Sequence, residues 1–139
     1  MNAVAAPHGA VFTLQSHEIE RNWGLLESHL ERVKRDFPDD IDIPLILGDL
    51  ICARKQLWGY HDGEHITGIC VTEIQHPVCW LRVGVGTESW HGQIEAITDA
   101  IESWARSIGC ERIKIAGRMG WKRRLPAYRQ IGVILEKSL

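Results

Sequence analysis

Apolar residues recur at helical spacing in the first third of the chain. Six of them, spaced alternately four and three residues apart, line one face of a predicted helix over residues 16–37: Ile19, Trp23, Leu26, Leu30, Val33 and Phe37. The hydroxyl of Ser16 is a suitable N-cap, and Pro38 ends the helix because proline disfavours helical geometry in the residue before it. A second amphipathic helix is predicted over residues 44–55, with Pro44 in its first turn.

The pattern changes to that of strands in the middle of the chain. Runs of β-branched and alternating apolar residues predict three consecutive antiparallel strands over residues 57–60, 66–74 and 79–85. Asp62-Gly63 separates the first two runs and His76-Pro77 separates the last two, as expected of tight turns.

Helical spacing returns after these strands. Ile94, Ile97, Ile101, Trp104 and Ile108 repeat at intervals of three and four residues, and Gly109 suits the position just past a helix end. This is the clearest helix in the sequence.

The two ends of the chain are less regular. After the long helix, the pattern predicts a strand over residues 112–116, a short helix over 122–131 and a final strand over 133–137. At the other end, residues 1–9 show no periodicity and are expected to form a flexible arm before a short strand over residues 10–14. The predicted order is therefore strand, helix, helix, three strands, helix, strand, helix, strand.

Composition and length indicate one compact domain. The 139 residues are 45% hydrophobic and 24% charged, which is typical of globular proteins and excludes collagen-like or strongly disordered chains. No stretch approaches the roughly 20 apolar residues of a membrane-spanning helix, and the first residues lack the pattern of a signal peptide. We therefore expect a soluble, intracellular protein in which the arm of residues 1–9 precedes a single domain of residues 10–139.

Charge is unevenly distributed along the chain. The net charge is −2, yet residues 111–139 contain eight basic and only two acidic side chains. A basic cluster around Trp121 is the candidate surface for an anion or an acidic protein partner: Arg118, Lys122, Arg123, Arg124 and Arg129. A solvated basic helix explains the same residues, and nucleic acid is disfavoured because the whole chain is mildly acidic.

Cysteine and histidine residues form no recognised metal-binding pattern. Cys52, Cys70, Cys79 and Cys110 are spaced 18, 9 and 31 residues apart without a C-x-x-C pair, and no H-E-x-x-H motif is present. We expect reduced, mostly buried cysteines and no metal site.

The order of elements resembles that of the GNAT superfamily of acetyl-CoA-dependent N-acyltransferases over almost the whole chain. Near the end, Tyr128-Arg129-Gln130-Ile131-Gly132-Val133 is similar to the Tyr-x-x-x-Gly-Phe ending of the last helix in that superfamily. The resemblance implies a single α/β (α+β) domain with a central, mostly antiparallel mixed sheet flanked by helices.

A narrower resemblance rests on four short motifs. They are Leu57-Trp58-x-x-x-Asp62-Gly63, Val71-Thr72-Glu73-Ile74, Trp104-Ala105-Arg106-x-x-Gly109-Cys110 and Gly117-Arg118-x-Gly120-Trp121. Together they are similar to small GNAT-like proteins encoded in tailed phages and prophages, often among structural genes and usually without an assigned activity. This resemblance implies a genomic setting more than a reaction.

The cofactor-binding pattern of the superfamily is altered in this chain. Its acyltransferases hold the pyrophosphate of acetyl-CoA with Gln/Arg-x-x-Gly-x-Gly/Ala, where glycine lets backbone N–H groups approach the phosphates. Here the spacing after Arg82 is one residue short, and Glu88 and Trp90 occupy the stretch where phosphate would lie. The candidate cofactor contacts that remain are Gly84, Gly86, Ser89 and Gly92. Glu88 and Ser89 equally suit an ordinary helix start.

Two residues are candidates for acyl-transfer chemistry. The resemblance implies that Tyr128 acts as a general acid toward the thiolate of departing coenzyme A, whereas its structural alternative is core packing with a hydrogen-bonded hydroxyl. Glu73 would act as a general base if it faced a cleft, because burial would raise its pKa into the working range. The alternative for Glu73 is an outward-facing strand position.

Two functions remain open from the sequence. The first is a non-enzymatic phage or prophage protein with a degenerate acetyl-CoA loop and no cofactor, which acts through protein contacts in virion assembly or as an accessory factor. It would lie in the phage particle or in the cytoplasm of the bacterial host, and an open sheet edge near its end would allow homo-oligomers. The second is an active N-acyltransferase that uses acetyl-CoA and an unknown amine acceptor.

Overall fold

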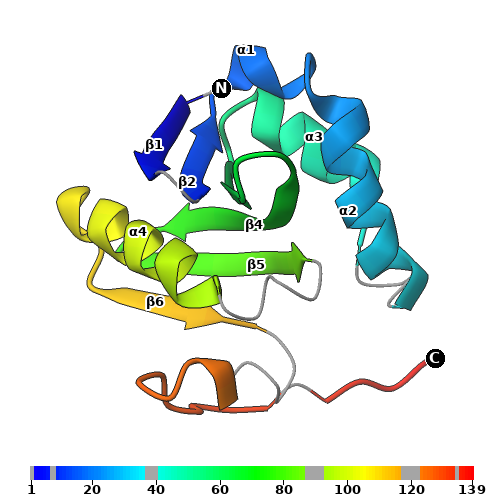
Figure 1. Cartoon of the computed structure of the whole chain (residues 1–139). Coiled ribbons are helices and arrows are strands. Elements are labelled where there is room, and N and C mark those ends of the chain that lie inside the picture. Colours follow the sequence, from blue (N-terminus) through cyan, green and yellow to red (C-terminus); the bar gives the residue numbers. More distant parts are fainter. Residues whose placement is uncertain (1, 7–8, 37–40, 87–92, 117–122, 134) are drawn as a thin grey trace.

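The computed structural model describes residues 2–6, 9–36, 41–86, 93–116, 123–133 and 135–139. Within this part of the chain, six strands form one sheet in sequence order: β1 (Asn2–Ala6), β2 (Gly9–Leu14), β3 (Gln56–His61), β4 (Ile66–Gln75), β5 (Val78–Gly86) and β6 (Arg112–Ile115). Neighbouring strands are antiparallel except β5 and β6, which are parallel. This is the predicted single domain with a mostly antiparallel mixed sheet (Figure 1).

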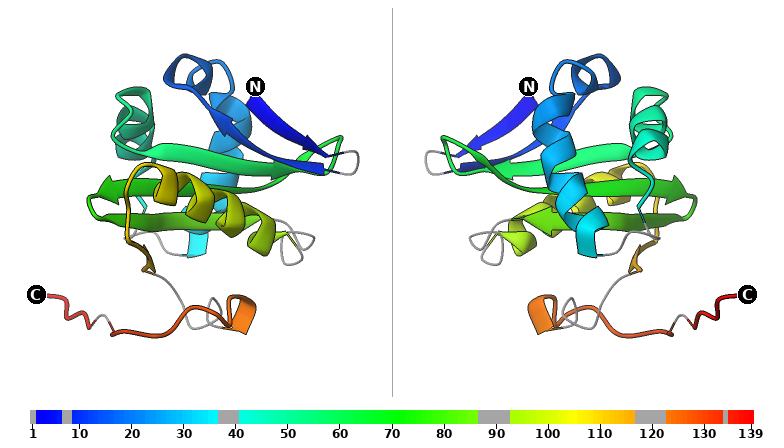
Figure 2. Two further views of the ribbon diagram at one scale, coloured as in Figure 1. Left: turned by 90° about the vertical axis from the view of Figure 1, so that its left-hand side faces the viewer. Right: turned by 90° about the vertical axis from the view of Figure 1, so that its right-hand side faces the viewer.

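Helices cover both faces of the sheet. On one face lie α1 (Ser16–Ile19), α2 (Trp23–Asp36) and α3 (Ile43–Ile51), and on the other lies α4 (Ile94–Ser107), as Figure 2 shows. Each side has its own apolar core, and β4 contributes to both because successive residues point to opposite faces: Ile69 and Val71 contact the α1–α3 side, and Cys70 contacts the α4 side. The core is therefore sheet-centred, with two layers of helices.

The predicted first helix is divided in the structure. It ends as α1 at Ile19 and resumes as α2 at Trp23, and the side-chain amide of Asn22 donates to the Glu18 carbonyl oxygen across the break, at 2.8 Å. Ser16 is not the N-cap. Gln15 takes that position, and its backbone N–H donates to the Glu18 carboxylate at 3.0 Å.

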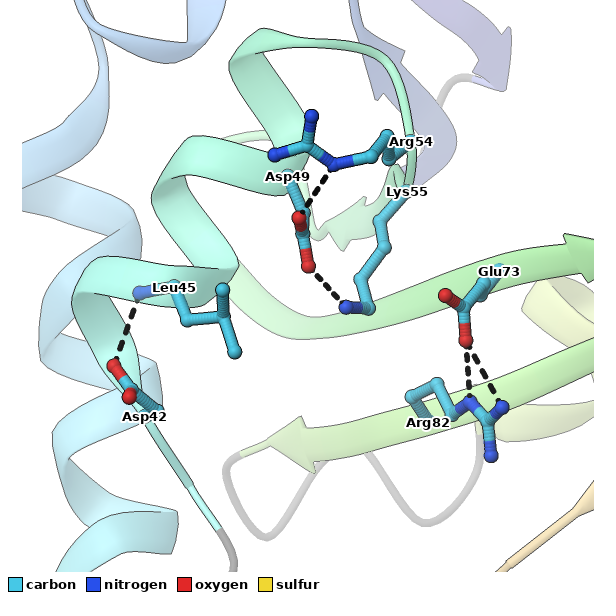
Figure 3. Close-up of polar contacts among 7 residues, drawn as sticks. All are labelled: Asp42, Leu45, Asp49, Arg54, Lys55, Glu73 and Arg82. Carbon is cyan, nitrogen blue, oxygen red and sulfur yellow. Dashed lines mark hydrogen bonds and ion pairs between the residues drawn. The ribbon is translucent and has the colours of Figure 1, made fainter.

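The second helix begins one residue before Pro44 and ends earlier than predicted. Asp42 caps its start by accepting from the Leu45 backbone N–H at 3.0 Å (Figure 3). It ends at Ile51 because Ala53 has a positive φ of 58°, outside helical geometry.

The structure contains a strand at the N-terminus that the sequence pattern does not predict. Residues 2–6 form strand β1, which pairs with β2 from Asn2 opposite Thr13 to Ala6 opposite Gly9, whereas the sequence predicted a flexible arm over residues 1–9. Small residues give no periodic signal, and the strand is specified by backbone pairing with β2 instead.

The C-terminal prediction also differs from the structure. Among the described residues, 123–131, of the helix predicted over 122–131, only residues 123–124 are helical, and the described residues of the strand predicted over 133–137 form no ladder. Leu125 is nevertheless buried on the α4 side, and Tyr128 packs against the same core. The segment that follows runs past β6 and away from the sheet (Figure 2). We refer to residues 131–139 as the tail.

One irregularity in the sheet bears on function. The ladder between β4 and β5 shifts register between Val71 and Thr72, so Arg82 is an extra residue on β5 and forms a bulge. On its other edge, β5 pairs with β6 as far as Leu81, which immediately precedes Arg82 and is opposite Ile115. In the described part of the chain, residues 83–86 of β5 therefore form ladder pairs with β4 alone, and Arg82 forms none.

Candidate functional site

Tyr128 is held against α4. Its hydroxyl donates to Glu102 Oε2 at 2.8 Å, and its half-buried ring packs on the α4-side core. Burial, followed by the hydrogen bond to Glu102, raises the pKa of Tyr128 above its ordinary value of 10.0. The hydroxyl is therefore protonated at neutral pH and directed at a carboxylate of the same chain.

Glu73 lies in β4 and is engaged by an arginine on the neighbouring strand. Its Oε1 accepts a hydrogen bond from Nε of Arg82 at 2.9 Å and forms an ion pair with Nη2 of the same residue, also at 2.9 Å (Figure 3). Glu73 is opposite Trp80 in the ladder, and the Trp80 ring has the Arg82 guanidinium 4.5 Å and the Lys114 ammonium 5.4 Å from its centre. These four side chains form one cluster, which we call the Trp80 cluster.

The two catalytic candidates lie on opposite faces of the sheet. Thr72 contributes to the α4 side, where its hydroxyl accepts from buried Trp58 at 3.0 Å, so Glu73, the next residue along β4, points to the other face. Tyr128 packs on the α4 side. The structure therefore does not bring Glu73 and Tyr128 together.

The candidate cofactor contacts are only partly described. Gly84 and Gly86 lie in β5 opposite Cys70 and Gly68 of β4. Ser89 and Gly92 lie outside the described residues, as do Glu88 and Trp90. In the described part of the chain, the β5 backbone beyond the bulge does not pair with β6, which leaves peptide groups facing the side where β6 ends.

The basic cluster predicted around Trp121 is also only partly described. Arg123, Arg124 and Arg129 belong to the segment beside β6, and all three are exposed, while Arg118, Trp121 and Lys122 lie outside the described residues. A cavity of about 1760 Å³ is lined by this segment together with residues of α4 and β6. Acidic residues of α4 line it, among them Glu95, Asp99 and Glu102. This wall is unfavourable for an anion.

Sequence reasoning missed Glu102 and the Trp80 cluster. Glu102 occupies an ordinary helix position 26 residues before Tyr128, and nothing in its neighbourhood signals the contact. Part of the Trp80 cluster is visible in the sequence, because Trp80 and Arg82 are two residues apart on one predicted strand. The other two members, Glu73 and Lys114, lie on β4 and β6, and the sequence does not show that they meet the first two.

Cysteine environments follow the prediction of mostly buried residues, with one exception. Cys70 and Cys79 are buried, Cys110 is half-buried and Cys52 is exposed, and all four are free. Burial raises the pKa of Cys79 to about 11, which makes this thiol a poor nucleophile. Within the described ranges, no three His, Cys, Asp or Glu side chains gather as a metal site would require, and no helix is long and apolar enough to cross a membrane.

Comparison with known proteins identifies the fold. No protein-family model matches the chain, and no curated protein matches it. Among solved structures, the aminoglycoside N-acetyltransferase AAC(6')-Iy bound to a CoA bisubstrate analogue is similar, with a TM-score of 0.70, 15% identity and coverage of 95% of this chain and 99% of that one.

Two further structures have the same architecture. The aminoglycoside acetyltransferase meta-AAC0020 from an uncultured soil metagenomic sample has a TM-score of 0.68 and 11% identity, over 95% of this chain and 97% of that one. A ribosomal-protein-alanine N-acetyltransferase from Brucella melitensis biovar Abortus 2308 has a TM-score of 0.61 and 14% identity, over 94% and 95%. At these identities the likeness establishes the fold alone.

Proposed function

We propose that this chain, which has the GNAT fold, acts through contacts with another protein and not through acyl transfer. One observation carries the proposal: the candidate acid Tyr128 and the candidate base Glu73 lie on opposite faces of the sheet, each bound to another side chain of the protein. An acyltransferase that used both would need them beside one substrate.

The environment of Tyr128 supports a structural role. A general acid works best when its pKa is near the operating pH, whereas burial and Glu102 move the pKa of Tyr128 upward. The hydroxyl proton is also directed at Glu102 and not at an open site. Both features suit a tyrosine that fixes the C-terminal segment to α4.

The resemblance to small proteins of tailed phages and prophages supports a setting for this function. In that setting the partner is a phage structural protein, and the chain acts in virion assembly or as an accessory factor, in the particle or in the cytoplasm of the bacterial host. Exposed Arg123, Arg124 and Arg129 support a partner with an acidic surface. The proposed protein needs no cofactor.

A second candidate, acetyl-CoA-dependent N-acyltransfer, is favoured by the bulge at Arg82. Over residues 82–86 of the described chain, the edge of β5 that faces away from β4 has no ladder partner and fits the amide groups of an acyl-CoA arm, and bulges are common beside binding sites. A solved acetyltransferase with this fold contains CoA, at 16% identity. In this function Gly84 and Gly86 would contact the cofactor with Ser89 and Gly92, and Tyr128 would be the acid.

Calorimetry with acetyl-CoA and coenzyme A separates the two functions. A ligand that binds only the folded state must also raise the melting temperature, so a thermal-shift series at up to about 1 mM ligand is run in parallel. We expect no saturable binding. Saturable binding would overturn the proposal, and a Tyr128→Phe variant would then be assayed for turnover against Tyr60→Phe, the chain's other tyrosine.

The protein-contact function has its own positive test. The chain is co-expressed with the products of neighbouring genes, each tagged in turn, and complexes are purified at moderate salt. We expect one stable pair, and we expect a variant with Arg123, Arg124 and Arg129 changed to Glu to lose it. A variant with Arg21, Arg32 and Arg35 changed to Glu is the control, because it alters the net charge equally at exposed positions that do not line the cavity beside this segment.

A further inference from the structure

The Trp80 cluster crosses three neighbouring strands in one row. Glu73 of β4 and Lys114 of β6 both lie opposite Trp80 of β5 in the ladders. The residues on either side of Lys114 contact the α4-side core, so Lys114 points to the other face of the sheet, as Glu73 does. Arg82 follows Trp80 on this same face of β5 and contacts both Glu73 and the Trp80 ring. The cluster is therefore one continuous surface, with a carboxylate at one end and an ammonium group at the other.

The Trp80 ring lies outside both apolar cores of the described chain. It is half-buried and packs with neither the α1–α3-side core nor the α4-side core. The Arg82 guanidinium lies 4.5 Å from the centre of the ring, and the ion pair with Glu73 holds that guanidinium in place (Figure 3). Tryptophan and arginine are the residues most often responsible for affinity at protein interfaces. A tryptophan held in this way suits a contact with another protein better than it suits the core.

Three polar groups of the cluster have unused hydrogen-bonding capacity. The indole N–H of Trp80 donates to no described residue, and the Lys114 ammonium forms no ion pair with one. The Oε1 atom of Glu73 is engaged by Arg82, whereas Oε2 accepts no hydrogen bond within the described chain. The cluster therefore offers two donors and one acceptor on the same surface.

The charge of this face favours a carboxylate as the ligand of the two donors. The ion pair within the cluster is neutral, and Lys114 adds a positive charge. Arg112 lies two residues before Lys114 on the same face of β6, and its pair with Glu111 is weak because the two groups are 3.8 Å apart and exposed. The Lys114 ammonium is 5.4 Å from the centre of the Trp80 ring, so one carboxylate can accept from both the ammonium and the indole N–H.

A short protein segment fits these groups better than a nucleic acid does. A segment that contains Asp or Glu supplies carboxylates for the two donors and backbone N–H groups for Oε2 of Glu73. The phosphate groups of a nucleic acid supply no donor. A long polyanion would also meet Glu95 and Asp99 of α4, which line the same cavity as Trp80.

We propose that the Trp80 cluster is the docking site for a short acidic segment of the protein partner. A carboxylate of the segment accepts from Trp80 and Lys114, a backbone N–H donates to Glu73, and a neighbouring apolar side chain covers the Trp80 ring. The inference rests on the proposed function, since it specifies the chemistry of the partner. Trp80, Lys114 and Arg129 line one cavity, so the docked segment lies beside the basic C-terminal segment.

The test uses defined probes and heteronuclear NMR on the full chain. The probes are the peptide Glu-Glu-Leu-Glu-Glu, the peptide Lys-Lys-Leu-Lys-Lys and a thymidine oligonucleotide, and the spectrum of a Trp80→Phe variant identifies the indole signal of Trp80. We expect the acidic peptide, at up to about 1 mM, to shift the signals of Trp80 and Lys114 saturably. The other two probes should leave these signals unchanged.

Two lysine variants make the same change of charge at different places. Lys114→Glu alters the cluster, and Lys137→Glu is the matched control because Lys137 is exposed and does not line the cavity. We expect Lys114→Glu to weaken binding of the acidic peptide by about tenfold and Lys137→Glu to leave it unchanged. Trp80→Phe, which removes the indole N–H and keeps a ring, should also weaken it. The dispersion of the spectrum verifies that each variant is folded.

The outcomes separate this docking site from the proposed function. No response of Trp80 to the acidic peptide overturns the docking site, and so does a response that Lys114→Glu leaves unchanged. A response to the oligonucleotide or to the lysine peptide in place of the acidic one overturns it as well. The co-expressed pair still decides the proposed function in each case: a pair that tolerates Lys114→Glu keeps the protein-contact function and loses the docking site, whereas failure to form any pair counts against the function itself.

Discussion

At the scale of single residues, the hydroxyl of Tyr128 is the contact that distinguishes a structural role from a catalytic one. Removing it in Tyr128→Phe loses the hydrogen bond to Glu102, and we expect the free energy of unfolding to fall by about 1 kcal/mol. Urea denaturation measures the change, with Tyr60→Phe as the control. Unchanged stability would contradict the structural role.

His29 predicts a pH dependence of stability. It is buried on α2, its Nδ1 has no hydrogen-bond partner within the described residues, and burial, followed by the charge of Arg32, lowers its pKa below 6.5. The unfolded chain therefore binds more protons than the folded one below about pH 6.5, so stability falls as the pH falls through that value.

The measurement is the melting temperature of His29→Leu between about pH 7.5 and pH 5.5, a window around the ordinary histidine pKa. We expect this variant to lose less stability on acidification than the wild type. His65→Leu is the control because the side chain of His65 is 80% exposed. Equal acid sensitivity of His29→Leu and the wild type would contradict the assignment.

The candidate site could be predicted from sequence as residue types but not as geometry. The motif that begins at Tyr128 identifies the candidate acid, and a glutamate within the predicted strand over residues 66–74 identifies Glu73 as the candidate base. The sequence does not predict that these two residues lie on opposite faces of the sheet. β4 is buried on both sides along most of its length, so its residues show no polar and apolar alternation that would reveal which way Glu73 points. The bulge at Arg82 has no sequence signal either.

At the scale of elements, strands β2 and β3 depend on one close approach. Phe12 is opposite Gly59 in the ladder, and a Cβ atom at position 59 would overlap the Phe12 ring. We expect Gly59→Ala to destabilise the protein by about 1–3 kcal/mol, since the buried ring has little room to move.

Gly48→Ala is the matched control for this change. Gly48 lies within α3, and a Cβ atom there meets nothing within 4 Å. Alanine is the better helix former, so we expect this variant to gain about 0.5–1 kcal/mol. Thermal and urea denaturation of both variants measure the pair, and a Gly59→Ala protein as stable as the wild type would show that the sheet accommodates the methyl group.

Elements with a strong period were predictable and elements made by pairing were not. α2 and α4 follow apolar spacing, and β3 to β5 follow β-branched runs between turns. β1 consists mostly of small residues and is formed by backbone pairing with β2, so no local hydrophobic pattern predicts this strand. The reverse holds for the tail, because its sequence pattern predicts a strand but its described residues pair with no other strand of the described chain.

At the scale of the whole molecule, the charge asymmetry seen in the sequence has a spatial counterpart. The basic C-terminal segment and the acidic residues of α4 line the same cavity, with Arg129 among the former and Glu95 and Asp99 among the latter. Part of the basic surface therefore faces the protein itself. The tail beyond this segment contains the exposed apolar residues Ile131, Val133, Leu135 and Leu139, and exposed apolar residues in succession are typical of a surface that another molecule covers.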